Sequence, residues 1–390
     1  MPHIIELVLL VGAIHFLVPL GYYAYLKRLV NRTWNLALDT GYTPRTTVVI
    51  PTFDESAIIE ARLDNIKAQS MPKEKLDVVV IDSGSRDRTS EIVDEWRLKN
   101  HDLKVSLITE PTRRGKAEAL NVALQATVSD IVVLTDADAM WTEEALRKAI
   151  YYFSDRRVGA VTGVKEPVSV VPEKRGKLES VYRRFYNVVR VGESKIHSTP
   201  IFNGELAAFK TDQLKAIGGF QGKIGADDSH AATLLALKGF RAIAVPEVVV
   251  FELAPKSWLG YLKWKKRRAL HLLQHFRIVT SKLGTAPREL RKILLTEAFL
   301  HILNPWLLLA ALAGYALSIV VEGLSIYHLA IGMLFGTTVL SERTRDPART
   351  WFVEQLILAY AAVNSLFTSE LVWPKIDELR TTASQATAKR

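Results

Sequence analysis

The sequence predicts an α/β domain in the middle of the chain and apolar helices at both ends. Between residues 46 and 135, short runs of β-branched residues alternate with segments of helical periodicity, a pattern typical of βαβ units and a parallel sheet. Residues 4–26 and most of 298–373 are apolar instead. The polar residues that follow the strands are candidates for a functional site, because open α/β sheets bind ligands at the carboxyl ends of their strands.

The strands and helices of the central domain can be placed in order along the chain. Four short runs predict strands, at residues 46–51, 76–81, 105–109 and 131–135, and the last of these is expected to be buried. Helices are expected between these strands, at residues 57–69, 90–99 and 116–126. A parallel arrangement would bring the polar segments after all four strands to one edge of the sheet.

Composition limits the class of protein and its partners. Of the 390 residues, 48% are hydrophobic and 24% are charged, with a net charge of +10. A basic balance favours nucleic acid or an anionic membrane surface as a neighbour. Because the ends are apolar, we expect a membrane and no nucleic acid. The chain has no cysteine, which excludes disulfides and thiolate metal sites.

The apolar ends have the length of membrane spans. Residues 4–26 match one spanning helix, and Lys27, Arg28 and Arg32 follow, which places this end in the cytoplasm. Further spans are expected at residues 298–321, 324–340 and 351–373. Three C-terminal spans would put the basic residues 375–390 outside, against the positive-inside rule. The number of C-terminal spans therefore stays open.

Two segments combine basic and aromatic residues. In residues 173–195, Arg183, Arg184, Arg190 and Lys195 lie among or opposite the residues of an apolar face, and residues 257–283 alternate Lys and Arg with Trp, Tyr and Phe. Basic amphipathic helices of this kind lie in membrane interfaces. The alternative is a helix packed on the central domain. We expect the interface, because apolar segments follow directly.

The segment Asp136-Ala137-Asp138 follows the fourth predicted strand. Two carboxylates spaced two residues apart at a strand end can both reach one hard cation. Mg²⁺ and Mn²⁺ prefer oxygen ligands and leave positions open for substrate phosphates. By itself the pattern is weak, since a solvated turn gives the same spacing. Its weight comes from the neighbouring loops.

Three further loops end strands or open helices. Asp54 follows the first strand, Asp82 the second, and Lys116 opens the third helix. Asp82 can accept hydrogen bonds from a base or ribose, and Lys116 with a helix N-terminus can hold phosphate. The alternative for Asp54 and Asp82 is a helix cap. Four such loops in order favour a nucleoside diphosphate site over isolated caps.

This order of motifs resembles family 2 of the glycosyltransferases, which has the GT-A fold, a Rossmann-like α/β architecture. The resemblance covers residues 46–275 and implies nucleotide contacts from Pro51, Asp54, Glu55, Asp82 and Lys116. It also implies that Asp138 binds Mg²⁺ or Mn²⁺ directly, with Asp136 contacting ribose or metal.

Later segments extend the resemblance. Residues 202–205 are similar to the acceptor loop, although Glu205 stands where the family often has Thr. Asp227-Asp228 is similar to the catalytic acidic pair, with Asp228 as general base. Residues 265–269 are similar to Gln-x-x-Arg-Trp, which implies that Arg268 gates the diphosphate and Arg267 contacts the nucleotide. The Gln and Trp of that motif are absent, and Trp264 lies five residues before the missing Trp, on a different side of the helix.

The resemblance implies an inverting glycosyltransferase with this division: N-terminal span and basic flank 1–32, catalytic domain 46–256, interfacial helices 257–292, C-terminal spans 293–374 and tail 375–390. The expected enzyme is a multi-pass cell-membrane protein with a cytoplasmic catalytic domain, similar to ceramide-type glucosyltransferases. Its donor would be a nucleotide sugar, a UDP-sugar by this resemblance, and its acceptor a lipid or lipid-linked glycan. The alternatives are a processive polysaccharide synthase, which the missing Trp disfavours, and a membrane protein with a vestigial nucleotide site.

Overall fold

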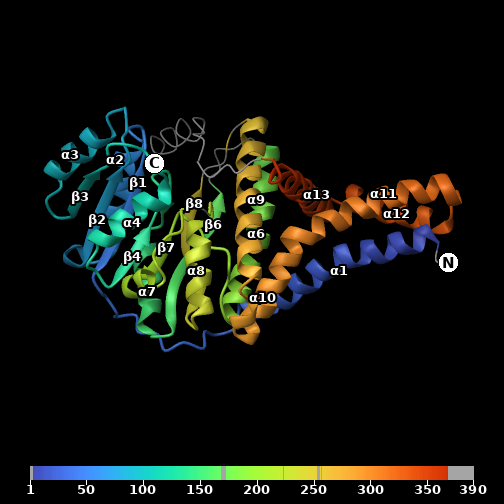
Figure 1. The fold of residues 1–390 in the computed structure, drawn as a ribbon, viewed down its shortest axis with the longest axis horizontal. Coiled ribbons are helices and arrows are strands. Elements are labelled where there is room, and N and C mark those ends of the chain that lie inside the picture. Colours follow the sequence, from blue (N-terminus) through green and yellow to red (C-terminus); the bar gives the residue numbers. More distant parts are fainter. Residues whose placement is uncertain (1–2, 168–172, 223, 253–254, 256, 368–390) are drawn as a thin grey trace.

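The computed structural model describes residues 3–167, 173–222, 224–252, 255 and 257–367. A mixed sheet of eight strands forms the centre, in the order β3-β2-β1-β4-β7-β6-β8-β5 (Figure 1). The strands are β1 (Thr46–Thr52), β2 (Leu76–Asp82), β3 (Lys104–Thr109), β4 (Ile131–Leu134), β5 (Met140–Trp141), β6 (Val158–Pro167), β7 (Ala207–Lys210) and β8 (Arg241–Glu252).

The first four strands confirm the predicted parallel order. β1 lies between β2 and β4 and pairs with both in parallel, so that Val48 faces Val78 on one side and Val133 on the other. β3 continues the sheet in parallel beyond β2. The other half departs from a purely parallel sheet, because β7 pairs antiparallel with both β4 and β6. The prediction of a parallel sheet is therefore wrong for this half, where the strands do not follow the regular strand–helix alternation.

Helices cover both faces of the sheet because the residues of β1 are buried on both sides. Val48 and Ile50 pack toward α2 (Ile59–Lys67), α3 (Thr89–Lys99) and α5 (Ala145–Tyr151). Val49 lies on the other face and packs toward α4 (Lys116–Ala126), α7 (Thr211–Ala216) and α8 (Asp227–Leu237). Apolar runs of this kind are typical of central strands with two covered faces.

Two long helices, α6 (Glu173–Ile196) and α9 (Trp258–Thr280), stand between the sheet and the apolar helices (Figure 1). Their basic residues are not all at a surface. Lys265 of α9 is 3% exposed, and its Nζ lies 2.9 Å from Glu179 and 2.8 Å from Glu354. Arg183 and Arg190 of α6 are buried as well. The interface interpretation is therefore wrong for these three side chains, because they face carboxylates and a cavity inside the protein.

For the exposed basic residues of the segment 257–283, a position in the membrane interface stays a prediction. Lys263, Arg277 and Lys282 point to the outside of the protein. Their side chains could meet anionic headgroups, whereas the buried ones could not.

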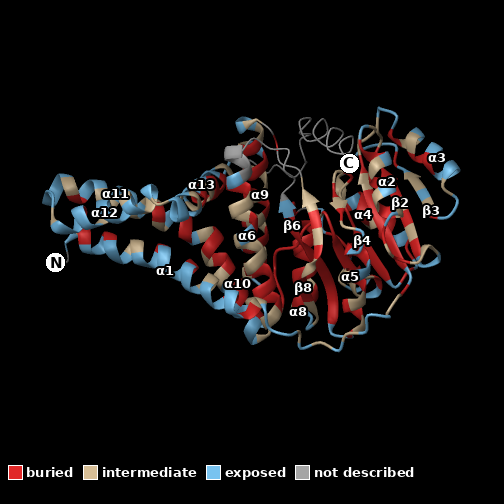
Figure 2. Cartoon of the chain, turned by 180° about the vertical axis from the view of Figure 1, so that it is seen from behind, coloured by how far each residue is buried: buried red, intermediate tan, exposed pale blue. Residues whose placement is uncertain are grey.

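The apolar helices extend away from the sheet domain (Figure 1). They are α1 (Ile4–Val30), α11 (Asn304–Glu322), α12 (Ile326–Leu340) and the apolar second half of α13 (Glu342–Asn364). The amphipathic helix α10 (Arg288–Ala298) precedes them and packs Leu290 and Leu294 against the sheet domain. A π-helical turn, η4 (Phe299–Leu303), joins α10 to α11. Much of the surface of α1, α11 and α12 is exposed, as Figure 2 shows, although these helices are rich in large apolar side chains.

Two helices among the described residues are long and apolar enough to cross a membrane, Ile4–Val30 and Arg288–Glu322. They correspond to the predicted spans 4–26 and 298–321, and the domain boundary expected at 292/293 falls inside α10. α12 has 15 residues and is about 22 Å long, shorter than a hydrocarbon core. α13 begins with charged residues and packs its apolar side on α9. The tail 375–390 lies outside the described residues.

The buried ion pairs of Lys265 lead to a prediction about stability. Lys265→Met would leave Glu179 and Glu354 buried without their shared cation, so we expect a loss of about 3–5 kcal/mol in the free energy of unfolding. Thermal unfolding in detergent, followed by tryptophan fluorescence, would show this as a lowered Tm. The matched control is Lys263→Met on the exposed side of the same helix, which should change stability by less than about 0.5 kcal/mol. Equal Tm values for the two variants would contradict this account.

Candidate active site

A cavity of about 900 Å³ opens where β1 and β4 end and where α6 and α9 face them. It brings together most of the residues that the sequence predicted for the site, namely Pro51, Glu55, Lys116, Asp136, Asp138, Asp227, Asp228, Arg267 and Arg268. These residues come from segments up to 217 positions apart in the chain (51 to 268). The sheet places them together because the loops after parallel strands share one edge.

Asp54 and Asp82 do not line this cavity. The carboxylate of Asp82 accepts hydrogen bonds from Thr52 Oγ1 at 3.2 Å, from Ser90 Oγ at 2.7 Å, and from Ser85. Asp54 has a left-handed backbone, with φ of 55°, and its Oδ1 accepts from the backbone N–H of Arg86 at 2.8 Å. Both carboxylates thus hold the loops after β1 and β2 together, and a base contact from Asp82 stays a prediction.

Gly204 marks the point where the phosphate loop, the acidic strand end and α8 meet. A Cβ added at Gly204 would lie 3.2 Å from Lys116 Nζ, 3.3 Å from Asp136 Oδ2 and 3.6 Å from Asp228 Oδ2. Lys116 Nζ donates to Asp136 Oδ1 at 2.6 Å. Burial alone would lower the pKa of Lys116, but the charges of Asp136 and Asp227 raise it. Lys116 therefore stays cationic, as a phosphate ligand requires.

Asp138 is the carboxylate best suited to hold a metal ion. Burial raises its pKa to about 7, and the charges of Asp136, Glu55 and Glu205 act in the same direction. Asp138 has no ion-pair partner among the described residues, whereas Asp136 is paired with Lys116. A divalent cation would relieve the repulsion among these carboxylates. The described residues contain no group of three or more His, Asp or Glu arranged to hold a metal, so substrate phosphates would supply the remaining ligands, as is common for Mg²⁺.

Asp227 and Asp228 form the first turn of α8. Burial raises the pKa of Asp227 to about 6, and it also raises the pKa of Asp228, while the charge of Lys116 opposes both shifts. Asp228 Oδ1 accepts from the backbone N–H of Ser229 at 2.7 Å, and its Oδ2 is the atom that approaches Gly204. A carboxyl with a raised pKa that faces a cavity can accept a proton at neutral pH.

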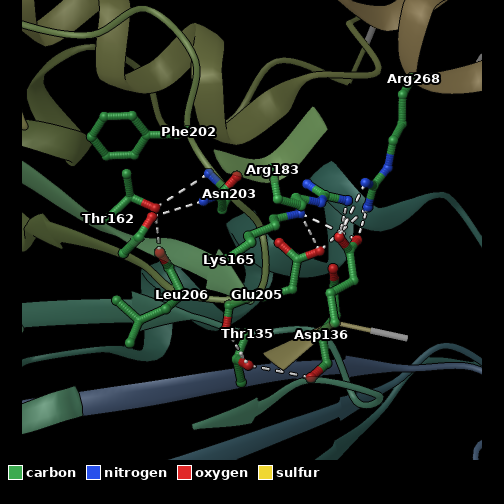
Figure 3. Close-up of polar contacts among 12 residues, drawn as sticks. Thr135, Asp136, Thr162, Lys165, Arg183, Phe202, Asn203, Glu205, Leu206 and Arg268 are labelled. Carbon is green, nitrogen blue, oxygen red and sulfur yellow. Dashed lines mark hydrogen bonds and ion pairs between the residues drawn. The ribbon is translucent and has the colours of Figure 1, made fainter. Parts of the chain in front are cut away.

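The two arginines of α9 face different carboxylates. Arg267 lines the cavity together with Asp136 and Asp138; burial lowers its pKa, and the charges of these two carboxylates oppose the shift. Arg268 instead donates to Glu252 and lies 3.4 Å from Glu205 (Figure 3). The residue predicted to gate the diphosphate is thus held by protein carboxylates, and its neighbour faces the acidic strand end.

Comparison with known sequences identifies the family. A profile described as "Glycosyltransferase like family 2" matches residues 44–270. The chain belongs to this family. It is a glycosyltransferase, and its mixed sheet has the GT-A-like arrangement.

The relatives of this glycosyltransferase differ in length. "Probable glycosyltransferase YdaM" of Bacillus subtilis is 26% identical over 239 residues, which cover 57% of this chain and 54% of the relative. Poly-beta-1,6-N-acetyl-D-glucosamine synthase of Staphylococcus aureus is 27% identical over 226 residues, 57% of this chain and 52% of the relative. The chain thus spans about half the length of these two relatives.

One solved structure matches nearly the whole chain. The mannosyltransferase PcManGT from Pyrobaculum calidifontis, in complex with GDP-Man and Mn²⁺, is 43% identical. The match covers 93% of the present chain and 99% of the mannosyltransferase chain, with a TM-score of 0.82. The likeness therefore extends beyond the sheet domain to the helices around it.

A network of buried charges at the α6 side of the cavity was not predicted from the sequence. Lys165 Nζ lies 2.5 Å from Glu205 and 3.2 Å from Glu252, and Arg183 also donates to Glu252 (Figure 3). Burial opposes ionisation of Glu205, yet the charges of Lys165 and Arg268 lower its pKa to about 2. These residues come from β6, β8, α6, α9 and the acceptor loop, and no local motif connects them.

Trp264 also lines the cavity, and the guanidinium of Arg268 lies 4.0 Å from its ring centroid. Ala269, at the position of the family's Trp, packs in the cluster between α9 and α13. The prediction that Trp264 and Ala269 lie on different sides of the helix is confirmed. Trp264, however, faces the cavity, so the cavity does have an aromatic side chain in its lining.

Arg62 is a further residue that the sequence argument missed. It is fully buried in α2, and its guanidinium stacks on Trp141 at 4.0 Å and donates to Thr135 Oγ1 at 2.8 Å. Burial lowers its pKa to about 9, while the charges of Asp136 and Asp138 oppose the shift. A pattern could have revealed it, because Arg62 takes an apolar-face position between Ile59 and Ile66.

The raised pKa of Asp138 predicts how metal binding depends on pH. At pH 8, Mn²⁺ at a hundred times its Kd should raise the Tm of the wild type by about 3 °C, and Asp138→Asn should abolish this rise. At pH 6 the rise should be smaller, because a carboxyl with a pKa of about 7 must first lose its proton. Asp212→Asn, at an exposed carboxylate, is the control.

The raised pKa of Asp138 also affects the stability of the protein when no metal is bound. Because the folded-state pKa of Asp138 lies above the unfolded value, the folded state binds more protons, and stability should fall as pH rises from about 4 to 7. Asp138→Asn should remove this part of the pH dependence. Identical Tm profiles for wild type and variant, with and without Mn²⁺, would contradict the assignment of Asp138.

Proposed function

We propose that this glycosyltransferase transfers a sugar from a nucleoside diphosphate sugar to a hydroxyl group of a lipid or lipid-linked acceptor at the membrane. The observation that carries the proposal is the convergence of Lys116, Asp136 and Asp228 around Gly204, with Asp138 lining the same cavity. A phosphate ligand, a carboxylate pair for a cation and a base are the groups that this reaction needs.

The donor that we propose first is GDP-mannose, because the matched mannosyltransferase was solved with GDP-Man and Mn²⁺. UDP-sugars, expected from the motif resemblance, are the second class to test. Lys116 and Arg267 would hold the diphosphate in either case, since both line the cavity beside Asp136. A divalent cation bound through Asp138 would neutralise charge on the diphosphate.

The reaction follows as one displacement. Asp228 takes the proton of the acceptor hydroxyl, and the oxygen attacks the anomeric carbon. The bond between that carbon and the diphosphate oxygen breaks, and the diphosphate leaves with the electron pair. A single displacement inverts the anomeric centre. Arg268 would join the diphosphate only after leaving Glu252 and Glu205, which makes its ion pairs a resting position.

The acceptor is proposed to reach the site from a bilayer. The cavity is lined by α6 and α9, and these helices lie next to the apolar helices α1 and α13. Under the positive-inside rule, the positive residues after the first span support a cytoplasmic position for the sheet domain. A multi-pass arrangement, with α12 and α13 as additional membrane segments, belongs to the same proposal.

A polysaccharide synthase is the second candidate. One relative has that activity in its name, and Trp264 gives the cavity an aromatic surface on which a sugar could stack. The absence of the Gln and Trp of the processive motif, together with the small number of apolar helices, argues for the addition of one or a few sugars.

The variant Asp228→Asn should show which of the two acidic residues of α8 is the catalytic base. If Asp228 is the base, the variant should bind donor as the wild type does but lose transfer by roughly 100-fold or more. Isothermal titration with nucleoside diphosphate and Mn²⁺ gives the binding, and release of diphosphate gives the rate. Asp227→Asn is the comparison. If it is inactive while Asp228→Asn turns over normally, the base is Asp227.

Product size should separate the two candidate enzymes. Membranes containing the protein are incubated with labelled GDP-mannose or labelled UDP-sugars, and all products are resolved by thin-layer and size-exclusion chromatography. We expect a lipid-soluble product that carries one or a few sugars, with the largest yield from GDP-mannose. A high-molecular-weight glycan that forms independently of added lipid would establish the synthase instead.

A further inference from the structure

We infer that the acceptor carries a phosphate group and that Arg190 binds it. The inference rests on the proposed function, because it concerns the acceptor end of the same cavity. It adds a chemical class, a phosphate-bearing lipid, and a residue that none of the sequence motifs includes.

Arg190 is a buried cation that faces the cavity. It lies on α6, is 5% exposed and lines the cavity. Its Nη1 donates to Asn203 Oδ1 at 2.6 Å, and its Nε has no hydrogen-bond partner among the described residues. It forms no ion pair with a described carboxylate. Taking a charge out of water without a partner is costly, so a bound anion would remove this cost.

Within the adjacent network of ion pairs, Arg190 is the cation that no carboxylate contacts, although Glu297 lies near enough to interact with it electrostatically. In the network beside it, four cations are matched by four carboxylates: Lys165, Arg183, Lys265 and Arg268 contact Glu179, Glu205, Glu252 and Glu354. No carboxylate of this set contacts Arg190. A guanidinium with free donors is suited to phosphate, which it can bind through two parallel hydrogen bonds.

The position of Arg190 relates the phosphate to the reacting hydroxyl. Asn203, its hydrogen-bond partner, is held by a bond from Nδ2 to the Gly163 carbonyl at 2.8 Å. The next residue is Gly204, beside which Asp228 Oδ2 lies. Arg190 is thus connected through Asn203 to the loop position beside the proposed base, so a phosphate on Arg190 would lie in the same cavity as the hydroxyl that Asp228 activates.

The test compares matched lipids with and without phosphate. Full-length protein in phosphatidylcholine nanodiscs is titrated with farnesyl phosphate against farnesol, and with dioctanoyl phosphatidylglycerol against dioctanoylglycerol. The donor site is filled with Mn²⁺ and GDP or UDP, so that Lys116 is occupied, and the titrations are repeated without nucleotide. Binding is followed by tryptophan fluorescence. The first pair represents a phosphate monoester and the second a phospholipid headgroup, and inorganic phosphate is added as a competitor to detect binding of free phosphate.

We expect at least one phosphorylated lipid to bind roughly 10-fold or more tightly than its neutral counterpart. Arg190→Gln should remove this preference, whereas Arg190→Lys should keep part of it. Arg184→Gln, at an exposed arginine of the same helix, should leave it unchanged. None of the three variants should change nucleotide affinity.

Two results would overturn the inference. One is equal wild-type affinity for the phosphorylated and neutral lipids in both pairs, which does not depend on any variant folding. The other is an unchanged preference in Arg190→Gln. Failure of the wild type to bind either nucleotide would count against the proposed function, while the lipid comparison without nucleotide still tests this inference by itself.

Discussion

The active site depends on Glu205, which connects three parts of the protein. Its backbone carbonyl accepts hydrogen bonds from Thr135 Oγ1 at 2.9 Å and Trp141 Nε1 at 2.6 Å, which ties the acceptor loop to the acidic strand end. Its carboxylate faces Lys165 and Arg268. The positions of the metal side, the acceptor side and α9 are therefore coupled through one residue, at a site where a neutral Thr is common in the resembling family.

Buried charges of both signs give the cavity two different ends. At the strand ends, carboxylates lie close together, and burial raises the pKa values of Asp138 and Asp227. At the α6 end, cations and carboxylates alternate, and Lys165 and Arg268 hold Glu205 ionised. The first arrangement has more carboxylates than cations, even with Lys116 and Arg267 beside them, and it favours a further cation. In the second arrangement no carboxylate contacts Arg190, which favours a bound anion. The two ends of the cavity therefore suit different substrates of a two-substrate reaction.

The long helices α6 and α9 join the sheet domain to the apolar helices. Their inner sides carry ion pairs that end at Glu354 of α13, and their outer sides carry exposed basic residues such as Lys263 and Arg277. The same helices line the cavity. Movement of α13 relative to α9 would therefore disturb the ion pairs of Lys265, which is one of the four cations in the network at the α6 end of the cavity.

The sequence by itself determined the first half of the sheet and the chemistry of its loops. In this half of the sheet, short runs of Val and Ile predicted strands, and the groups that follow them, Lys116 and Asp136-Ala137-Asp138, reach one edge because parallel strands share a direction. The fully buried Arg62 was not predicted, although its position on an apolar helical face could have revealed it. Local spacing carries this information because each of these elements is shaped by residues a few positions apart.

Only the tertiary structure decided which basic residues lie inside. Lys263 and Lys265 are two positions apart in one helix, yet one is exposed and the other is buried between Glu179 and Glu354. The same holds for Arg184 and Arg190, and for the direction of Trp264 into the cavity. The two partners of Lys265, Glu179 and Glu354, lie 86 and 89 positions from it along the chain. A periodic pattern shows which residues share a helix face. Which charged residues lie opposite that face depends on the elements that pack against it.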